Sequence, residues 1–231
     1  MNLNKFSVNI DWLKITALIL MTVDHVAKIF PSICLGDVLQ SIGRISFPIF
    51  CFILMYHLQR QQIYKKYLIR LGVFAFLTFL TLALLKIIGA NVTIVPFNIL
   101  YMFFVCVLAL GLKKFTENKI QNIFWKNLVI CLVYIFCGAL VYRLSLLAFV
   151  YIILIYYFFE KPIKVNVVML LVFAFFVNLG GINGLVALIA TALLMNVDYD
   201  KKHQRIIKKW YIFYWYYPLH LAGLLLLAMY I

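Results

Sequence analysis

The sequence predicts an all-α fold: a polytopic transmembrane bundle of about nine helices, with the N-terminus inside and the C-terminus outside. Of the 231 residues, 67% are hydrophobic and only 12% are charged, and the mean hydropathy is +1.05. A soluble domain cannot bury this share of apolar residues, because polar groups have to cover its exterior. Apolar stretches of about 17–25 residues instead suit helices that cross the roughly 30 Å hydrocarbon core of a bilayer.

Nine apolar segments are candidate spans, and no stretch between them is long and polar enough to form a separate soluble domain. We therefore expect residues 1–231 to form a single integral membrane domain. The fifth to eighth segments are short and could be tilted, re-entrant or buried in the bundle, and residues 127–159 could form one bent element. The predicted spans are 12–31, 38–58, 68–88, 96–112, 127–142, 145–159, 165–179, 184–196 and 210–230.

The distribution of basic residues sets the expected orientation. With the N-terminus inside, 17 of the 21 lysines and arginines fall in the inner segments, as the positive-inside rule requires. Eight spans would place the basic loop "DYDKKHQRIIKK" outside, so nine spans are favoured. The formal charge of +14 is therefore an orientation signal, with anionic lipid headgroups of the bilayer as its main partner. Nucleic acid is not expected as a partner.

Cysteines and histidines show no metal-site pattern. The five cysteines have no CxxC spacing, and most lie within apolar runs, where a free thiol behaves as a small hydrophobe. The four histidines lack the spacing of zinc ligands. We therefore expect no metal and no disulfide framework.

Asp24 is an acid within the first span, in the run "DWLKITALILMTVDHVAKIF". A charge near the bilayer centre costs about 2.5–3.5 kcal/mol, so such a group usually faces a cavity and has a partner. At 1.5 Å per residue, Asp24 lies about 10 Å and Arg44 of the second span about 9 Å below the same outer boundary. The two side chains can therefore meet at one level, and Lys28, at i+4 from Asp24, is the competing partner.

His25 follows Asp24 directly and points about 100° away from it on an ideal helix. Asp24 is therefore not expected to orient the His25 ring. A neutral imidazole is the natural general base near neutral pH. The alternative interpretation is a structural histidine whose hydrogen bonds are satisfied within the bundle.

The last span contains a second polar cluster, in "KKWYIFYWYYPLHLAGLLLL". His220 lies near the middle of this span, and Pro218 should kink the helix just before it, since proline has no amide hydrogen. His220 could then line a cavity. The preceding aromatic residues are typical of an interfacial belt, an interpretation we favour for all of them except Tyr217.

The first span "LKITALILMTVDHVAKIF", the second-span run "IGRISFPIFCFIL" and the ending "FYWYYPLHLAGLLLL" together resemble the TraX family. The best-known member of that family N-acetylates conjugative pilin. The resemblance runs from one end of the chain to the other, although "NVDYDKKHQR" stands where relatives tend to have an Asn-Gly-rich turn. A more remote resemblance is to multipass acyltransferases that modify sugars.

The resemblance implies a bacterial cell-membrane enzyme that moves an acetyl group from acetyl-CoA to an amine or hydroxyl of a protein or glycan acceptor. It matches Asp24, His25, Arg44 and His220 as catalytic positions. In this reading His25 removes the acceptor proton and His220 positions or polarises the thioester carbonyl, or His25 carries the acetyl group covalently. Basic residues of the inner face, with Lys113 and Lys114 among them, would bind the phosphates of the donor, and Tyr217 is assigned to the same ligand.

Two other functions fit the polar residues of the spans. A proton-coupled transporter would use Asp24 and His25 as relay groups, although a single intramembrane acid and the lack of an internal repeat argue against it. A non-catalytic scaffold would use Asp24 and Arg44 only as a clamp between two helices. Loss of acetyl transfer in His25→Ala would separate the enzyme from both.

Overall fold

A computed structural model of the chain describes residues 6–30, 35–90, 98–161, 163–177, 181–201, 206 and 211–230. These residues are mainly helical, which confirms the predicted all-α membrane fold. A two-residue parallel pairing joins β1 (Phe6–Ser7) to β2 (Val197–Asp198). The helices are α1 (Ile10–Ile29), α2 (Gly36–Gly43), α3 (Ser46–Gln61), α4 (Tyr64–Ile87), α5 (Ile99–Lys119), α6 (Ile123–Leu140), α7 (Tyr142–Glu160), α8 (Lys164–Val177), α9 (Gly181–Met195) and α10 (Tyr211–Tyr230).

Each predicted span coincides with a helix, once α2 and α3 are taken together as the second span. Within the described part of the chain, five helices are long and apolar enough to cross a membrane: the α2–α3 unit, α4, α5, α6 and α10. The second part of α7, α8 and α9 are apolar but shorter. α1 is 20 residues long but carries four charged residues. Residues 127–159 form two helices and not the single bent element considered, because α6 ends at Leu140 and α7 begins at Tyr142.

The helix α4 illustrates the membrane-facing surface of the bundle. Its large exposed side chains recur every three or four residues and therefore lie on one helical face. In water such a stripe would be a large unpartnered apolar patch, whereas in a bilayer it is covered by lipid tails. The residues are Ile69, Val73, Phe76, Leu80, Leu84 and Ile87.

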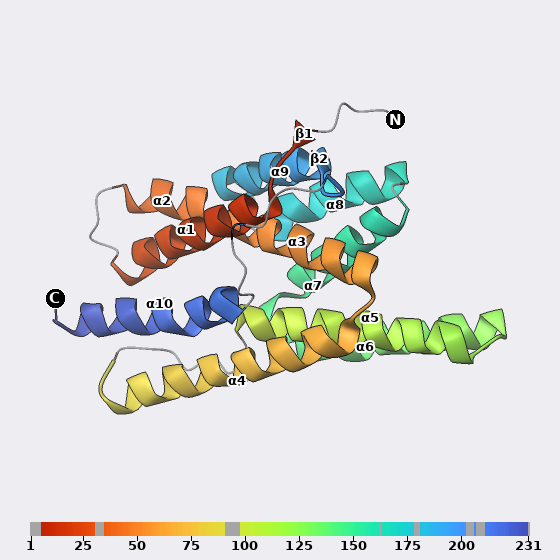
Figure 1. Cartoon of the computed structure of the whole chain (residues 1–231), viewed down its shortest axis with the longest axis horizontal. Helices are drawn as coiled ribbons and strands as arrows, with labels where there is room; N and C mark the ends of the chain where they lie inside the picture. Colours follow the sequence, from red (N-terminus) through yellow and green to blue (C-terminus); the bar gives the residue numbers. More distant parts are fainter. Residues whose placement is uncertain are drawn as a thin grey trace.

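The connections between helices gather at two ends of the molecule (Figure 1). The α3–α4, α5–α6 and α7–α8 turns lie toward the right of the view, and the ends of α1, α4 and α10 lie toward the left. The right-hand turns carry basic residues such as Arg60, Lys65, Lys119 and Lys161, and we call this side the basic end. The positive-inside rule predicts that the basic end faces the cell interior.

The break between α2 and α3 positions Arg44. The ring of Pro48 clashes with the carbonyl of the residue four positions earlier in a regular helix, and that residue is Arg44. The helix accordingly stops at Gly43 and restarts at Ser46. Gly43 lies so close to α1 that an added Cβ would be 2.5 Å from the Asp24 Cβ and 2.8 Å from its backbone. The absence of a side chain at Gly43 thus lets the break touch α1 beside Asp24.

Ser145 and Pro218 are two further positions at which a helix could be irregular. Ser145 has extended backbone angles and its hydroxyl accepts a hydrogen bond from the Ala148 amide at 3.1 Å, so it caps the main part of α7. Pro218 lies inside α10, which runs as one helix from Tyr211 to Tyr230, and the kink expected there stays a prediction.

The core is built around α3, α5 and α7. Fully buried residues include Phe52 and Met55 of α3, Val105 of α5 and Ile152 of α7. Three cysteines are free and buried as expected, and Cys131 is free but exposed, while Cys34 lies outside the described residues. The buried cysteines are Cys51, Cys106 and Cys137.

We expect Gly43→Ala to lower the free energy of unfolding by about 1–3 kcal/mol, because the new methyl group has no room against the α1 backbone. Thermal unfolding of the purified protein in detergent measures the effect. Gly36→Ala is the matched control, since it lies in the same helix and no atom lies within 4 Å of an added Cβ. Equal melting temperatures for the two variants would contradict the close approach of Gly43 to α1.

Candidate functional site

The helices α1 and α10 pack together and bring two histidines into contact. The Nε2 atom of His220 lies 3.2 Å from the Nδ1 atom of His25. The two ring centroids are 5.0 Å apart, with the ring planes inclined by 62°. Residues 195 positions apart in the sequence thus form one hydrogen-bonded pair.

The hydrogen bonds assign the protons of both rings. His25 Nδ1 lies 2.8 Å from the Met21 carbonyl, and His220 Nδ1 lies 2.8 Å from the Tyr216 carbonyl. A carbonyl oxygen only accepts, so both Nδ1 atoms carry hydrogen. With both rings neutral, His220 Nε2 then accepts from the N–H of His25. The Nε2 atom of His25 is left as a basic nitrogen.

Aromatic side chains hold this pair in place. Tyr216 stacks on His220, with ring centroids 5.0 Å apart and planes 13° apart. Its hydroxyl lies 2.6 Å from Thr22 Oγ1, which donates to the Leu18 carbonyl at 3.0 Å, so the Tyr216 hydroxyl is the donor in their contact. Tyr217 is buried and meets the rings of both histidines edge-on.

Asp24 is buried beside two cations. The Lys28 ammonium bonds the Oδ2 atom of Asp24, and Arg44 Nε lies 3.9 Å from Oδ1. The structure therefore brings Asp24 and Arg44 to one level, with the competing partner Lys28 making the closer contact. The Oδ1 atom of Asp24 and the Nε atom of Arg44 are buried without a hydrogen-bond partner. Two unsatisfied polar atoms of this kind are rare in a folded protein and are ready to bond a ligand.

A cavity of about 350 Å³, which we call the small cavity, opens beside these groups. His25 and the Asp24–Lys28–Arg44 cluster line it, together with Tyr217 and Ser46. His220 does not line the small cavity and lies behind His25. The expectation that His220 itself polarises a bound carbonyl therefore has a geometric difficulty: both of its ring nitrogens are engaged elsewhere.

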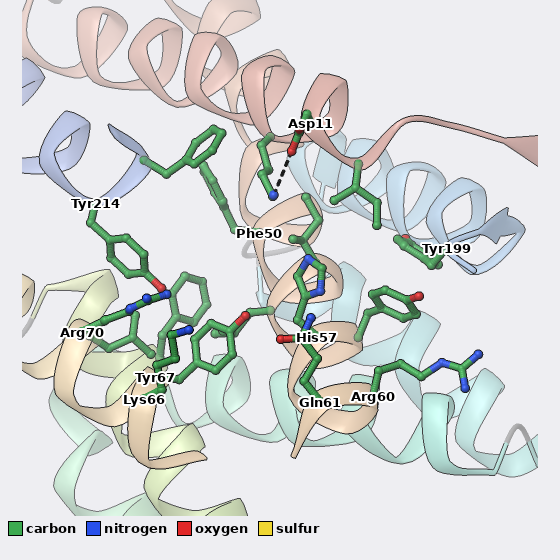
Figure 2. A pocket seen from close by; sticks show the side chains of 18 of the residues that line it. Asp11, Phe50, His57, Arg60, Gln61, Lys66, Tyr67, Arg70, Tyr199 and Tyr214 are labelled. Carbon is green, nitrogen blue, oxygen red and sulfur yellow. Dashed lines mark hydrogen bonds and ion pairs between the residues drawn. The ribbon is translucent and has the colours of Figure 1, made fainter. Parts of the chain in front are cut away.

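A larger cavity of about 830 Å³, the wide cavity, lies toward the basic end. Its walls come from the start of α1, the second half of α3, the start of α4, the start of α10 and the segment at Tyr199 (Figure 2). Burial raises the pKa of Tyr199, whose protonated hydroxyl donates to the Leu194 carbonyl at 3.0 Å. Four apolar residues line both cavities and form a shared wall: Phe50, Leu100, Phe103 and Phe213.

Lys113 and Lys114 line neither cavity. Lys113 is buried between Glu117 and Glu160, at 3.1 and 3.5 Å, and lies over the rings of two tyrosines of α7. Lys114 is exposed. The structure thus leaves these two lysines apart from His25, whereas Tyr217 lies beside it.

Sequence reasoning missed Thr22, Tyr216 and the lining of the wide cavity. Tyr216 was assigned to the interfacial belt, yet it lies four residues before His220 and so shares its helical face. The basic residues of the wide cavity were counted only as orientation signals. In the described part of the chain, no cluster of three His, Cys, Asp or Glu side chains suits a metal ion.

The family model for the TraX protein matches residues 9–228, nearly the whole chain. The chain belongs to the TraX family. No curated protein and no solved structure matches the chain. The match to the TraX family includes both helices of the histidine pair and the break that holds Arg44.

We expect Asp24→Asn to lower the free energy of unfolding by about 3 kcal/mol, at the lower end of the range for a broken buried ion pair, because Lys28 and Arg44 are partly exposed. Without the carboxylate, the two cations face each other uncompensated. Thermal unfolding of the purified variant measures the loss. Asp37→Asn, which removes an exposed acid from α2, is the control and should leave the melting temperature unchanged. Equal effects at both positions would contradict this account of Asp24.

Proposed function

We propose that this protein is a membrane-embedded acyltransferase that moves an acetyl group from cytosolic acetyl-CoA to an amine or hydroxyl of an acceptor. The observation that carries the proposal is the basic nitrogen of His25, which lies beside a cavity that shares a wall with a wider cavity of the basic end. Membership of the TraX family, which is associated with pilin acetylation, supports this reaction.

In the proposed reaction, His25 acts as the general base. Its Nε2 takes the proton of the acceptor amine or hydroxyl while the acceptor atom attacks the thioester carbonyl carbon. The tetrahedral intermediate then collapses, the carbon–sulfur bond breaks, and the proton on His25 passes to the departing thiolate. The products are the acetylated acceptor and the free thiol of CoA.

His220 would support this proton transfer without touching the substrate. Its Nε2 accepts the hydrogen bond from His25 Nδ1, so it stabilises the positive charge that His25 gains on protonation. The Tyr216 carbonyl fixes the tautomer of His220 that makes this acceptance possible. His220 is thus a positioning residue for His25 in this proposal, and not the group that polarises the thioester.

Arg44 would stabilise the oxyanion of the tetrahedral intermediate. Its Nε–H is buried at the wall of the small cavity and has no hydrogen-bond partner. A donor that is already oriented and poorly solvated stabilises a developing oxyanion strongly. Asp24 holds Arg44 in place and, through Oδ1, can also accept a hydrogen bond from the acceptor.

The family association favours a pilin-like protein as the acceptor, with an envelope glycan as the second class. The charge pattern predicts a bacterial plasma or inner membrane location with the basic end inside. The donor would then enter from the cytosolic side. The acceptor would reach His25 from beyond the membrane or from within it.

We expect His25→Ala to lower the rate of acetyl transfer by about 10²–10⁴, the usual contribution of a general base. His220→Ala should also lower the rate, and the double variant should lose no more than His25→Ala alone, because the two residues act as a unit. The measurement is acetyl-CoA-dependent labelling of peptides that carry a pilin N-terminus, with release of the CoA thiol followed in parallel.

Melting temperature and gel filtration of each variant are the controls for folding. Full transfer by folded His25→Ala would refute the catalytic role. If the wild-type protein instead drives proton-coupled uptake into vesicles without acetyl-CoA and transfers no acetyl group, the transporter alternative replaces the enzyme.

A further inference from the structure

The wide cavity has an excess of positive charge. Among the described residues, its lining contains five lysines and arginines and two carboxylates, which leaves three positive charges. Two of the cations are compensated locally: Lys14 Nζ lies 3.0 Å from Asp11, and Arg60 pairs with Asp200. The lining also contains the cations Lys66, Arg70 and Lys201.

The start of α4 carries the basic wall of this cavity. Lys66 and Arg70 are four residues apart and therefore lie on the same helical face, with Tyr67 between them in the sequence. Figure 2 shows Lys66, Tyr67 and Arg70 gathered with Tyr214 of α10, whereas the Arg60 guanidinium points away from them. This wall combines two cations with two aromatic rings.

The basic wall is connected to the histidine pair by the geometry of the cavities. Phe50 and Phe213 belong to the lining of both cavities, so the two cavities are adjacent and these rings form part of the wall between them. Along α1, Lys14 lines the wide cavity and His25 the small one, eleven residues further on. At 1.5 Å per residue this separation is about 16 Å. A ligand that reaches from one cavity to the other must therefore be long, with an anionic head and a slender tail.

We propose that the wide cavity binds the phosphorylated nucleotide part of a CoA thioester. Lys66 and Arg70 contact its phosphates, and the rings of Tyr67 and Tyr214 pack against its adenine. The pantetheine arm then passes the shared apolar wall and brings the thioester to His25. This assignment rests on the proposed function for the identity of the ligand, and it replaces Lys113 and Lys114 as phosphate contacts.

An anionic lipid headgroup offers the same phosphate chemistry to a basic cavity near a membrane surface. Two observations favour the nucleotide. The wall presents flat aromatic rings beside the cations, and such rings are suited to stacking against an adenine ring. The wide cavity also lies directly beside the small cavity of His25, and a CoA thioester, unlike a headgroup with two lipid tails, has a single narrow arm that can extend toward it.

The test measures binding of CoA, which has no acetyl group to transfer, by calorimetry with the full chain in phosphatidylcholine nanodiscs. We expect the double variant Lys66→Gln/Arg70→Gln to weaken CoA binding at least tenfold. The matched control is Lys65→Gln/Lys119→Gln, which removes two exposed lysines that line neither cavity and should leave CoA binding unchanged. Pantetheine, which lacks the phosphates, should bind neither the wild-type protein nor the variants detectably.

CoA binding by the His25→Ala variant distinguishes a failure of this inference from a failure of the proposed function. CoA binding that persists in His25→Ala but is lost in Lys66→Gln/Arg70→Gln supports the nucleotide site, even if no acetyl transfer is ever detected. Where transfer is measurable, the α4 variants should raise KM for acetyl-CoA at least tenfold with little change in kcat, the opposite of His25→Ala.

Three outcomes would overturn the assignment. The first is a failure of the folded wild-type protein to bind CoA. The second is unchanged CoA binding in the double α4 variant. The third is tight, saturable binding of phosphatidylglycerol, added to the nanodiscs, that is lost in the α4 variant while CoA binding stays intact. That last result would assign the wide cavity to a lipid headgroup.

Discussion

One hydrogen bond between α1 and α10 organises the centre of this protein. The N–H of His25 points both to the Met21 carbonyl and to the Nε2 atom of His220, and the Tyr216 carbonyl fixes the ring that accepts it. Carbonyls accept only, so the arrangement leaves the same nitrogen of His25 unprotonated whenever both rings are neutral. The chain thereby prepares a base within an otherwise apolar helix pair, and Asp24 with its cations is placed one residue away.

Most of the helical layout could be predicted from the sequence, because apolar length and loop charge are strong constraints on a membrane chain. The close approach of α1 to the α2–α3 unit was also predictable, since Asp24 and Arg44 lie at similar depths and Gly43 leaves room. The neighbouring position of Lys28 was expected from helix periodicity alone. What the periodicity could not decide was which cation makes the closer contact.

Contacts between distant segments were harder to predict. The pairing of His25 with His220 depends on how α10 packs against α1, and no local pattern specifies a contact across 195 positions. Lys113 illustrates the same limit: a lysine near a basic loop was expected to contact a phosphate, and no local pattern indicated that Glu117 and Glu160 would enclose it.

The shared apolar wall has a consequence for the membrane itself. Phe50, Phe103 and Phe213, with Leu100, stand between a chamber rich in charged groups and a second chamber that holds His25. Rings at such a constriction repel water, and a broken water file conducts protons poorly. A bundle with polar chambers at two depths can therefore remain impermeable to ions where it crosses a bilayer.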